Sequence, residues 1–167
     1  MRRILFTLSI ILATALTLQG EKVFADNKIH SIDISVELQE DGSAIVEETR
    51  NMTADDGTEL YIEMNNLQDS EVSNFSVKGF NFNPVWDSDQ SLEEKEEYYG
   101  IIRDGDDAEL VWGMGEHGDK TYQLTYTLSN VVRNLNDGQG LLWNFDTFLG
   151  IPTEDLKRIF NPFFTGE

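Results

Sequence analysis

The amino-acid sequence predicts an all-β protein, an antiparallel β-sandwich of immunoglobulin-like type, and three observations lead to that prediction. Apolar and polar residues alternate over short segments, Gly, Asp and Asn separate these segments, and helix-forming patterns are scarce. Alternation with a period of two is typical of half-buried strands, and many short strands separated by turns favour packed sheets. The 167 residues, 40% of them apolar, fit one domain with a core of its own.

The first strand candidate covers residues 29–38, where polar residues alternate with Ile32, Ile34, Val36 and Leu38. Asp41-Gly42 follows, and Asp-Gly between two apolar segments is a strong hairpin signal. We therefore expect a hairpin whose second strand covers 44–52. Further strands are expected over residues 58–64, 73–77, 80–85, 98–103, 109–113, 122–128 and 141–145.

Helical character is confined to residues 91–97. Ser91 is a candidate N-cap, and Glu93 and Glu94 follow it in what would be the first turn, where acidic side chains are favoured. An exposed acidic loop explains the same composition equally well. The sequence leaves these two alternatives open.

The first 25 residues have the order of a secretory signal peptide. Arg2 and Arg3 supply a positive start, residues 4–18 are apolar apart from Thr and Ser, and Val23 and Ala25 suit the positions before a cleavage site. We expect cleavage after Ala25. A retained membrane anchor is the alternative, although about 15 apolar residues are few for a span that needs about 20. The protein is thus expected outside the cytoplasm, either secreted or anchored at the cell surface.

Three segments are expected along the chain. They are the signal peptide at 1–25, a β-sandwich domain at 26–149, and an irregular or short helical tail, truncated at its end, at 150–167. No second apolar run of membrane-spanning length follows the signal. We therefore expect membrane attachment only through an uncleaved signal or through a downstream segment that the chain lacks.

Acidic residues outnumber basic residues by 31 to 12 over the whole chain. Without residues 1–25 the counts are 30 and 9, which gives a net charge of −21. Nucleic-acid binding depends on Lys and Arg that neutralise phosphates, and anionic lipid headgroups attract the same residues, so neither partner is expected. The absence of cysteine excludes thiol catalysis, thiolate metal sites and disulfides.

Calcium is the one cofactor for which the sequence offers weak candidates, and no other cofactor is expected. Asp87 and Asp89 lie in a run with oxygen-bearing side chains on alternate residues, as at the start of an EF-hand loop. Leu92 replaces the glycine that such a loop needs at its sixth position. Asp104 and Asp106 belong to a second acidic cluster. Solvated acidic loops are the simpler interpretation of both segments.

No catalytic motif stands out, and we expect no enzymatic activity. The two histidines, His30 and His117, are too few for a multi-histidine metal centre, and nucleophile-elbow and phosphate-loop patterns are absent. Carboxylate pairs of the glycosidase type have no sequence signature, so a glycan or cell-wall hydrolase that uses an Asp/Glu pair is the alternative. Trp86 is the best candidate for an exposed platform that stacks on sugars, whereas Trp112 and Trp143 fit the core.

Three segments carry a resemblance to a known family. They are the strand–turn–strand pattern of residues 32–49, the Trp112-Gly-Met-Gly motif followed by the alternating residues 121–128, and residues 137–145 around Trp143. The chain resembles the N-terminal extracytoplasmic domain of a family of predicted bacterial membrane proteins, domain of unknown function 2207. The resemblance implies an exported, membrane-anchored protein with a β-rich outer domain and later transmembrane helices, and it implies no catalytic residues.

The tail has a second, shorter resemblance. Residues 150–167 are similar to the F-box stretch of histidine-kinase ATP-binding domains, and Asp146 stands four residues before Gly150, as in that motif. Phe148 occupies the position of the motif's middle glycine, and the magnesium-binding helix and α/β sandwich of such domains are absent. A non-functional fragment fused to a kinase remnant is therefore a second alternative.

Together these observations predict a non-enzymatic, exported β-sandwich that serves as a cell-envelope interaction module. Its partner would be an envelope protein or a glycan, recognised by loops held on a rigid sheet.

Overall fold

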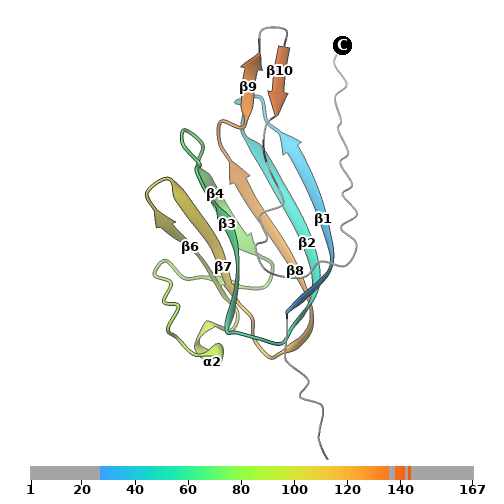
Figure 1. Cartoon of the computed structure of the whole chain (residues 1–167), viewed down its shortest axis with the longest axis vertical. Coiled ribbons are helices and arrows are strands. Elements are labelled where there is room, and N and C mark those ends of the chain that lie inside the picture. The colour runs from blue at the N-terminus through green and yellow to red at the C-terminus, as the bar shows by residue number, and fades with distance from the viewer. Residues whose placement is uncertain (1–26, 136–137, 142, 144–167) are drawn as a thin grey trace, which may run out of the picture.

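The computed structural model describes residues 27–135, 138–141 and 143, and in this part of the chain two four-stranded sheets pack face to face (Figure 1). The all-β sandwich predicted from the sequence is confirmed. The described elements are β1 (Lys28–Leu38), β2 (Ala44–Ala54), β3 (Glu59–Met64), β4 (Val72–Val77), β5 (Asn81–Phe82), α2 (Leu92–Lys95), β6 (Tyr98–Asp104), β7 (Asp107–Gly113), β8 (Gly118–Leu128), β9 (Val132–Leu135) and β10 (Gly138–Leu141).

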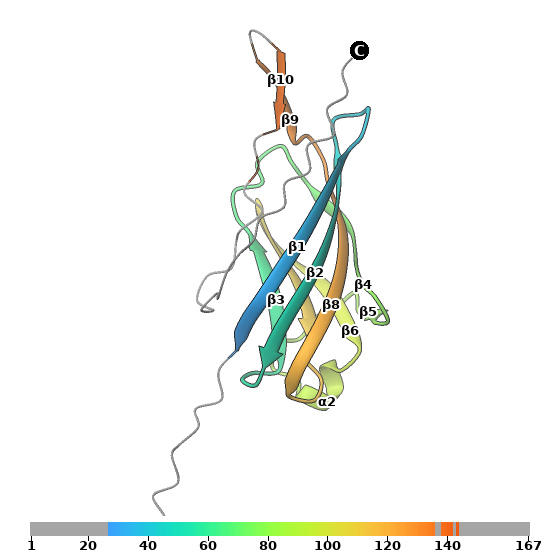
Figure 2. The ribbon, with the colours of Figure 1, turned by 90° about the vertical axis from the view of Figure 1, so that its right-hand side faces the viewer.

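The first sheet, sheet A, has the strand order β1-β2-β8-β4 and is antiparallel throughout. β1 and β2 form the predicted hairpin, and β8 pairs along the whole of β2 (Figure 2). At the hairpin turn, Gly42 has a φ of 82°, a left-handed conformation that glycine adopts without steric cost. The Gln39 N–H closes this turn by donating to the Ser43 carbonyl. The Asp-Gly signal therefore predicted the turn correctly.

The second sheet, sheet B, has the order β3-β7-β6-β5. Its β5–β6 pair is parallel, so sheet B is mixed, whereas the sequence predicted antiparallel pairing. The strand expected over 80–85 is reduced to Asn81–Phe82. Pro84 has no N–H to donate to a ladder, and the chain after Asn83 leaves the edge of the sheet to cross its outer face.

The core lies between the inner faces of the two sheets. Trp112 of β7 contacts Tyr122 of β8 and Phe75 of β4, with ring centroids 5.7 and 6.5 Å apart, so aromatic side chains join the sheets. Trp112 is fully buried, as predicted, and Trp143 packs half-buried against the same core. Removal of this apolar surface from water is the main force that stabilises the sandwich.

Several strand boundaries differ from the sequence prediction. β2, β7 and β8 are longer than expected, and β9 and β10 form a hairpin that the alternation pattern did not reveal. Of the strand expected over 141–145, Leu141 ends β10 and Trp143 lies outside any strand, while the other residues fall outside the described part of the chain. The β9–β10 segment contains two glycines, which obscure the alternation.

Residues 91–97 contain a single helical turn, which decides between the two alternatives in favour of the helix. The Glu94 N–H donates to Ser91 Oγ (3.4 Å), and the Ser91 N–H donates to Glu94 Oε2 (2.9 Å). This reciprocal pair is a capping box, which satisfies two backbone donors at the start of α2.

Neither end of the chain is described. The predicted signal peptide at 1–25 and the predicted tail at 150–167 both lie outside the described residues. Among the described residues, no helix has the length and apolar character needed to cross a membrane.

Candidate functional site

Residues 83–97, here called the strap, cross the outer face of sheet B. Trp86 packs over Gly100 of β6, where an added Cβ would lie 3.2 Å from Trp86 Cε3. The indole Nε1 donates a 2.6 Å hydrogen bond to Glu59 Oε2 at the start of β3. Trp86, predicted as an exposed platform for sugars, is therefore half-buried and fixed to the sheet by its polar atom.

Lys95 fastens the other end of the strap. Its side chain is 1% exposed, and its Nζ lies 3.0 Å from Glu59 Oε2 and donates to Thr58 Oγ1 (2.9 Å) and the Ser88 carbonyl (2.6 Å). Three acceptors suit the three donors of an ammonium group, so the buried charge is fully compensated. Glu59 thus contacts both Trp86 and Lys95, and these contacts hold the strap on sheet B.

A second set of buried charges lies on the inner face of β2. Glu48 and Arg50 are 2% and 1% exposed, and Arg50 Nε and Nη2 lie 2.7 and 2.5 Å from Glu48 Oε2. The Tyr126 hydroxyl of β8 donates a 2.6 Å hydrogen bond to Glu48 Oε1. Burial, together with the neighbouring Glu48 carboxylate, raises the pKa of Tyr126 well above its ordinary value. Both oxygens of Glu48 are therefore occupied by partners within the fold.

Next to the strap, the outer face of sheet B carries further acidic side chains and a tyrosine. Glu59, Tyr61 and Glu63 alternate with buried residues along β3 and therefore share this face. Glu63 stands directly opposite Glu109 of β7, and Tyr61 stands opposite Val111. The face thus has a carboxylate row beside a row that contains an aromatic ring.

In the described part of the chain, no base compensates the carboxylate row. Within the described residues, neither the Glu63 nor the Glu109 side chain forms an ion pair or a hydrogen bond. Partial burial of Glu109, reinforced by the charges of Glu63 and Glu59, raises the pKa of Glu109. Like charges directly opposite each other on paired strands destabilise a sheet, so this pair costs the fold stability.

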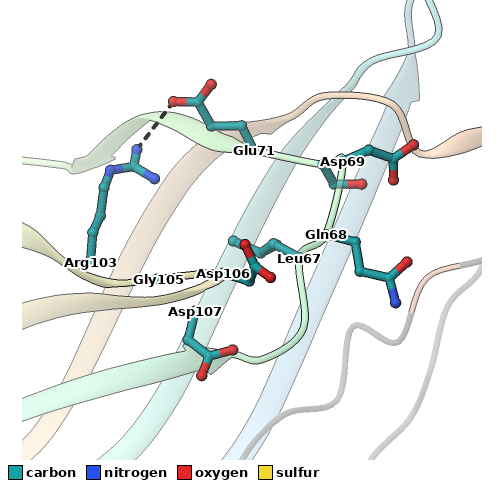
Figure 3. A pocket seen from close by; sticks show the side chains of 9 residues that line it. Leu67, Gln68, Asp69, Glu71, Arg103, Gly105, Asp106 and Asp107 are labelled. Carbon is teal, nitrogen blue, oxygen red and sulfur yellow. Dashed lines mark ion pairs between the residues drawn. The ribbon is translucent and has the colours of Figure 1, made fainter.

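A polar pocket of about 350 Å³ lies where the loop between β3 and β4 meets the turn between β6 and β7 (Figure 3). Arg103 reaches it from β6, donates a 2.6 Å hydrogen bond to the Val72 carbonyl, and lies 3.7 Å from Glu71 Oε1. The lining residues are Leu67, Gln68, Asp69, Ser70, Glu71, Arg103, Gly105, Asp106 and Asp107. Four carboxyl groups against one guanidinium make this pocket unfavourable for anions.

The walls of the pocket are fixed by backbone groups. The Asn66 N–H donates to Asp107 Oδ1 (2.8 Å), and the Leu67 N–H donates to the Asp106 carbonyl (2.9 Å). Asn130 Nδ2 donates to the Asp69 carbonyl (2.6 Å) from the segment after β8. Three segments far apart in the sequence therefore hold one another at this end of the sandwich.

The calcium candidates fall on two different elements. Asp87 and Asp89 lie in the strap, where the Asp89 N–H donates to Asp87 Oδ1 (3.0 Å), and Asp104 and Asp106 lie at the end of β6 and in the following turn. In the described ranges, no group of three or more Asp, Glu or His side chains is arranged to hold a metal ion. Calcium binding at these four residues stays a prediction.

The two histidines occupy exposed positions. His30 Nε2 lies 2.8 Å from Thr53 Oγ1, and this hydroxyl donates to Asp119 Oδ1 (2.6 Å), in a row across β1, β2 and β8. In a catalytic triad one imidazole nitrogen faces the carboxylate and the other faces the hydroxyl, whereas here Asp119 Oδ1 lies 4.0 Å from the same Nε2 that contacts Thr53. His117 Nε2 lies 3.1 Å from the Gly57 carbonyl and links two turns. Both histidines therefore link neighbouring segments at the surface.

Sequence reasoning missed three of these features. Glu48 and Arg50 have the same parity along β2 as the buried Val46 and Met52, so the alternation could have revealed them. The Glu63–Glu109 pair depends on the register between β3 and β7, which no local pattern supplies. The burial of Lys95 likewise depends on how the strap packs.

Residues 28–156 match the family described as "Predicted membrane protein (DUF2207) N-terminal domain". Comparison with curated proteins gives no match. The family match spans most of the chain and includes every described strand. The resemblance inferred from three sequence segments is confirmed, and the chain belongs to the family of predicted membrane proteins (DUF2207), as its N-terminal domain.

Proposed function

We propose that this chain is a binding module of the cell envelope, exposed outside the cytoplasm and without catalytic activity of its own. The order of residues 1–25, positive then apolar then small, supports export. Membership in a family of predicted membrane proteins supports association with the envelope.

One observation carries the non-catalytic part of the proposal. Glu48 and Lys95, buried in the fold, have their charges compensated by internal partners, Arg50 and Glu59. Glu63 and Glu109, which no base compensates within the described residues, are partly exposed and lie on the face of sheet B that points away from the core. Enzymes place reactive groups in sites from which water is excluded, whereas recognition uses exposed groups on a rigid support. The distribution of charge favours recognition.

The proposed partner is a protein or a glycan of the envelope. Loops and strand faces would contact it while the sandwich keeps them in position. The large negative charge of the chain favours a partner with positive groups and repels anionic wall polymers unless divalent cations bridge them.

The test combines hydrolysis assays on cell-wall glycans with calorimetric titration of calcium, both on the full chain. We expect no release of reducing ends and only weak calcium binding. Turnover of any wall glycan that disappears when one acidic residue is changed would overturn the proposal.

A hydrolase is the second candidate, because one carboxylate pair has a property that such enzymes use. The pKa of Glu109 is raised opposite Glu63, as a general acid requires. Under this alternative, Glu109→Gln abolishes glycan hydrolysis, while Glu47→Gln on the outer face of sheet A leaves it unchanged. The partial exposure of the pair on a sheet face argues against this alternative.

A further inference from the structure

The outer face of sheet B combines two properties that together define a ligand. Tyr61 is 44% exposed in the row next to Glu63 and Glu109, and the partly exposed Ile102 continues the carboxylate row on β6. The strap borders the same face, with Trp86 packed over Gly100. Apolar and aromatic side chains therefore adjoin two carboxylates on the paired strands β3, β7 and β6. Figure 1 shows these three strands side by side.

We infer that this face, defined by Tyr61, Glu63, Ile102 and Glu109, docks a lysine- or arginine-bearing segment of a partner polypeptide. The inference rests on the proposed binding function and names the partner class and the surface.

Charge complementarity selects the occupant. Within the described residues, no basic side chain pairs with Glu63 or Glu109, whereas Lys95 already compensates Glu59 on the same face. A cation placed between two opposed carboxylates would remove their mutual repulsion. A cationic group on a partner is therefore the ligand that relieves the cost the pair imposes.

The aromatic row selects a cation on a hydrocarbon stem. Lys and Arg bury their methylene stems along apolar surface while their charged heads remain at its polar edge. The exposed ring of Tyr61 also attracts a cation to its face. A free metal ion has no hydrocarbon stem to bury against the apolar surface, so it would use less of this face.

The experiment measures binding of a defined probe to the full chain by calorimetry at low salt. The probe is an acetylated, amidated heptapeptide with two lysines separated by one leucine, and its control has glutamine at both lysine positions. Glu63→Gln/Glu109→Gln tests the face. Glu37→Gln/Glu47→Gln, on the exposed outer face of sheet A, changes the net charge equally and serves as the matched control.

We expect the two-lysine peptide to bind and the glutamine control peptide not to bind. The Glu63/Glu109 variant should lower its affinity about fivefold, whereas the Glu37/Glu47 variant should change it less than about twofold. Tyr61→Leu, which keeps apolar area and removes the ring, should lower it about two- to threefold. Equal losses in both double variants would show unspecific attraction and would overturn the inference.

Two further probes separate other ligands. If glucosamine oligomers or calcium bind in a way that depends on Glu63 and Glu109, and the peptide does not, the assignment of a polypeptide ligand is overturned. If the Glu63/Glu109 substitutions leave peptide affinity unchanged, the peptide does not bind at this surface, while the proposal of a binding module still stands. Glycan turnover would refute that broader proposal instead.

Discussion

Gly113 of β7 lies so close to Lys95 that a Cβ on the glycine would be 1.9 Å from the Lys95 carbonyl oxygen. The obstructing atom belongs to the backbone at the end of α2, so a side chain at residue 113 would force the strap away from the sheet. The absence of a side chain at this position therefore permits the strap to pack on sheet B.

Gly113→Ala is expected to lower the free energy of unfolding by about 2–4 kcal/mol, because the overlap displaces backbone. Gly100→Ala meets Asn83 O at 3.0 Å and Trp86 Cε3 at 3.2 Å, a milder overlap, and should cost less. Urea denaturation of both variants checks the order. A larger cost at Gly100 than at Gly113 would contradict the packing described for the strap.

The buried pair on β2 makes a second prediction. Glu48→Gln leaves Arg50 with a buried charge and should destabilise the protein by about 3–5 kcal/mol. Tyr126→Phe removes one hydrogen bond and leaves the ion pair, so its cost should be about 1–3 kcal/mol. Thermal or urea unfolding distinguishes the two values. Equal effects would mean that the ion pair adds nothing beyond the tyrosine contact.

Alkaline pH should weaken the fold through Tyr122. Burial raises the pKa of Tyr122 to about 12, so the folded state keeps this proton after the unfolded chain has lost it. The resulting stability is complete below about pH 10 and is lost as the pH rises towards about 12, by at most about 1.4 kcal/mol per pH unit. Unfolding measured between pH 8 and about 12 should show this decline.

Tyr122→Phe is the control for the alkaline experiment. The variant loses the hydrogen bond that the hydroxyl donates to the Met114 carbonyl (3.0 Å), at a cost of about 1 kcal/mol near neutral pH. Its stability should then decline less steeply above about pH 10. An unchanged decline would assign the alkaline loss to other groups.

Ionised Glu109 in the carboxylate row should lower the stability of the fold. Because the pKa of Glu109 is raised, the folded state binds this proton more readily than the unfolded chain, and stability falls as the pH rises through that titration. Glu109→Gln should therefore stabilise the protein at pH 7 by a few tenths of a kcal/mol and have less effect at pH 4. Destabilisation at pH 7 would show that Glu109 has a favourable partner within the chain.

The features that could be predicted from the sequence are those that depend on a local pattern of residues. Alternating residues located β1, β2 and β8, Asp41-Gly42 located a hairpin turn, and burial of Trp112 followed from its apolar strand. In each case the signal lies within a few consecutive residues.

Features that depend on register or on packing between distant segments escaped prediction. The parallel pairing of β5 with β6, the contact of Lys95 with Glu59, and the opposition of Glu63 and Glu109 each join residues that no local pattern relates. Most of the candidate site belongs to this class. Trp86 and the weak calcium candidates Asp87, Asp89 and Asp106 were identified beforehand, but their contacts were not, such as the packing of the Trp86 ring against Gly100.

The outer face of sheet B is the surface on which we propose that recognition occurs. The most direct test is a map of backbone NMR shifts during titration with the two-lysine peptide. We predict that the largest changes fall on Tyr61, Glu63, Ile102 and Glu109 and are absent from the outer face of β2. Changes concentrated instead around Asp106 and Asp107, in the pocket beside Arg103, would contradict the claim.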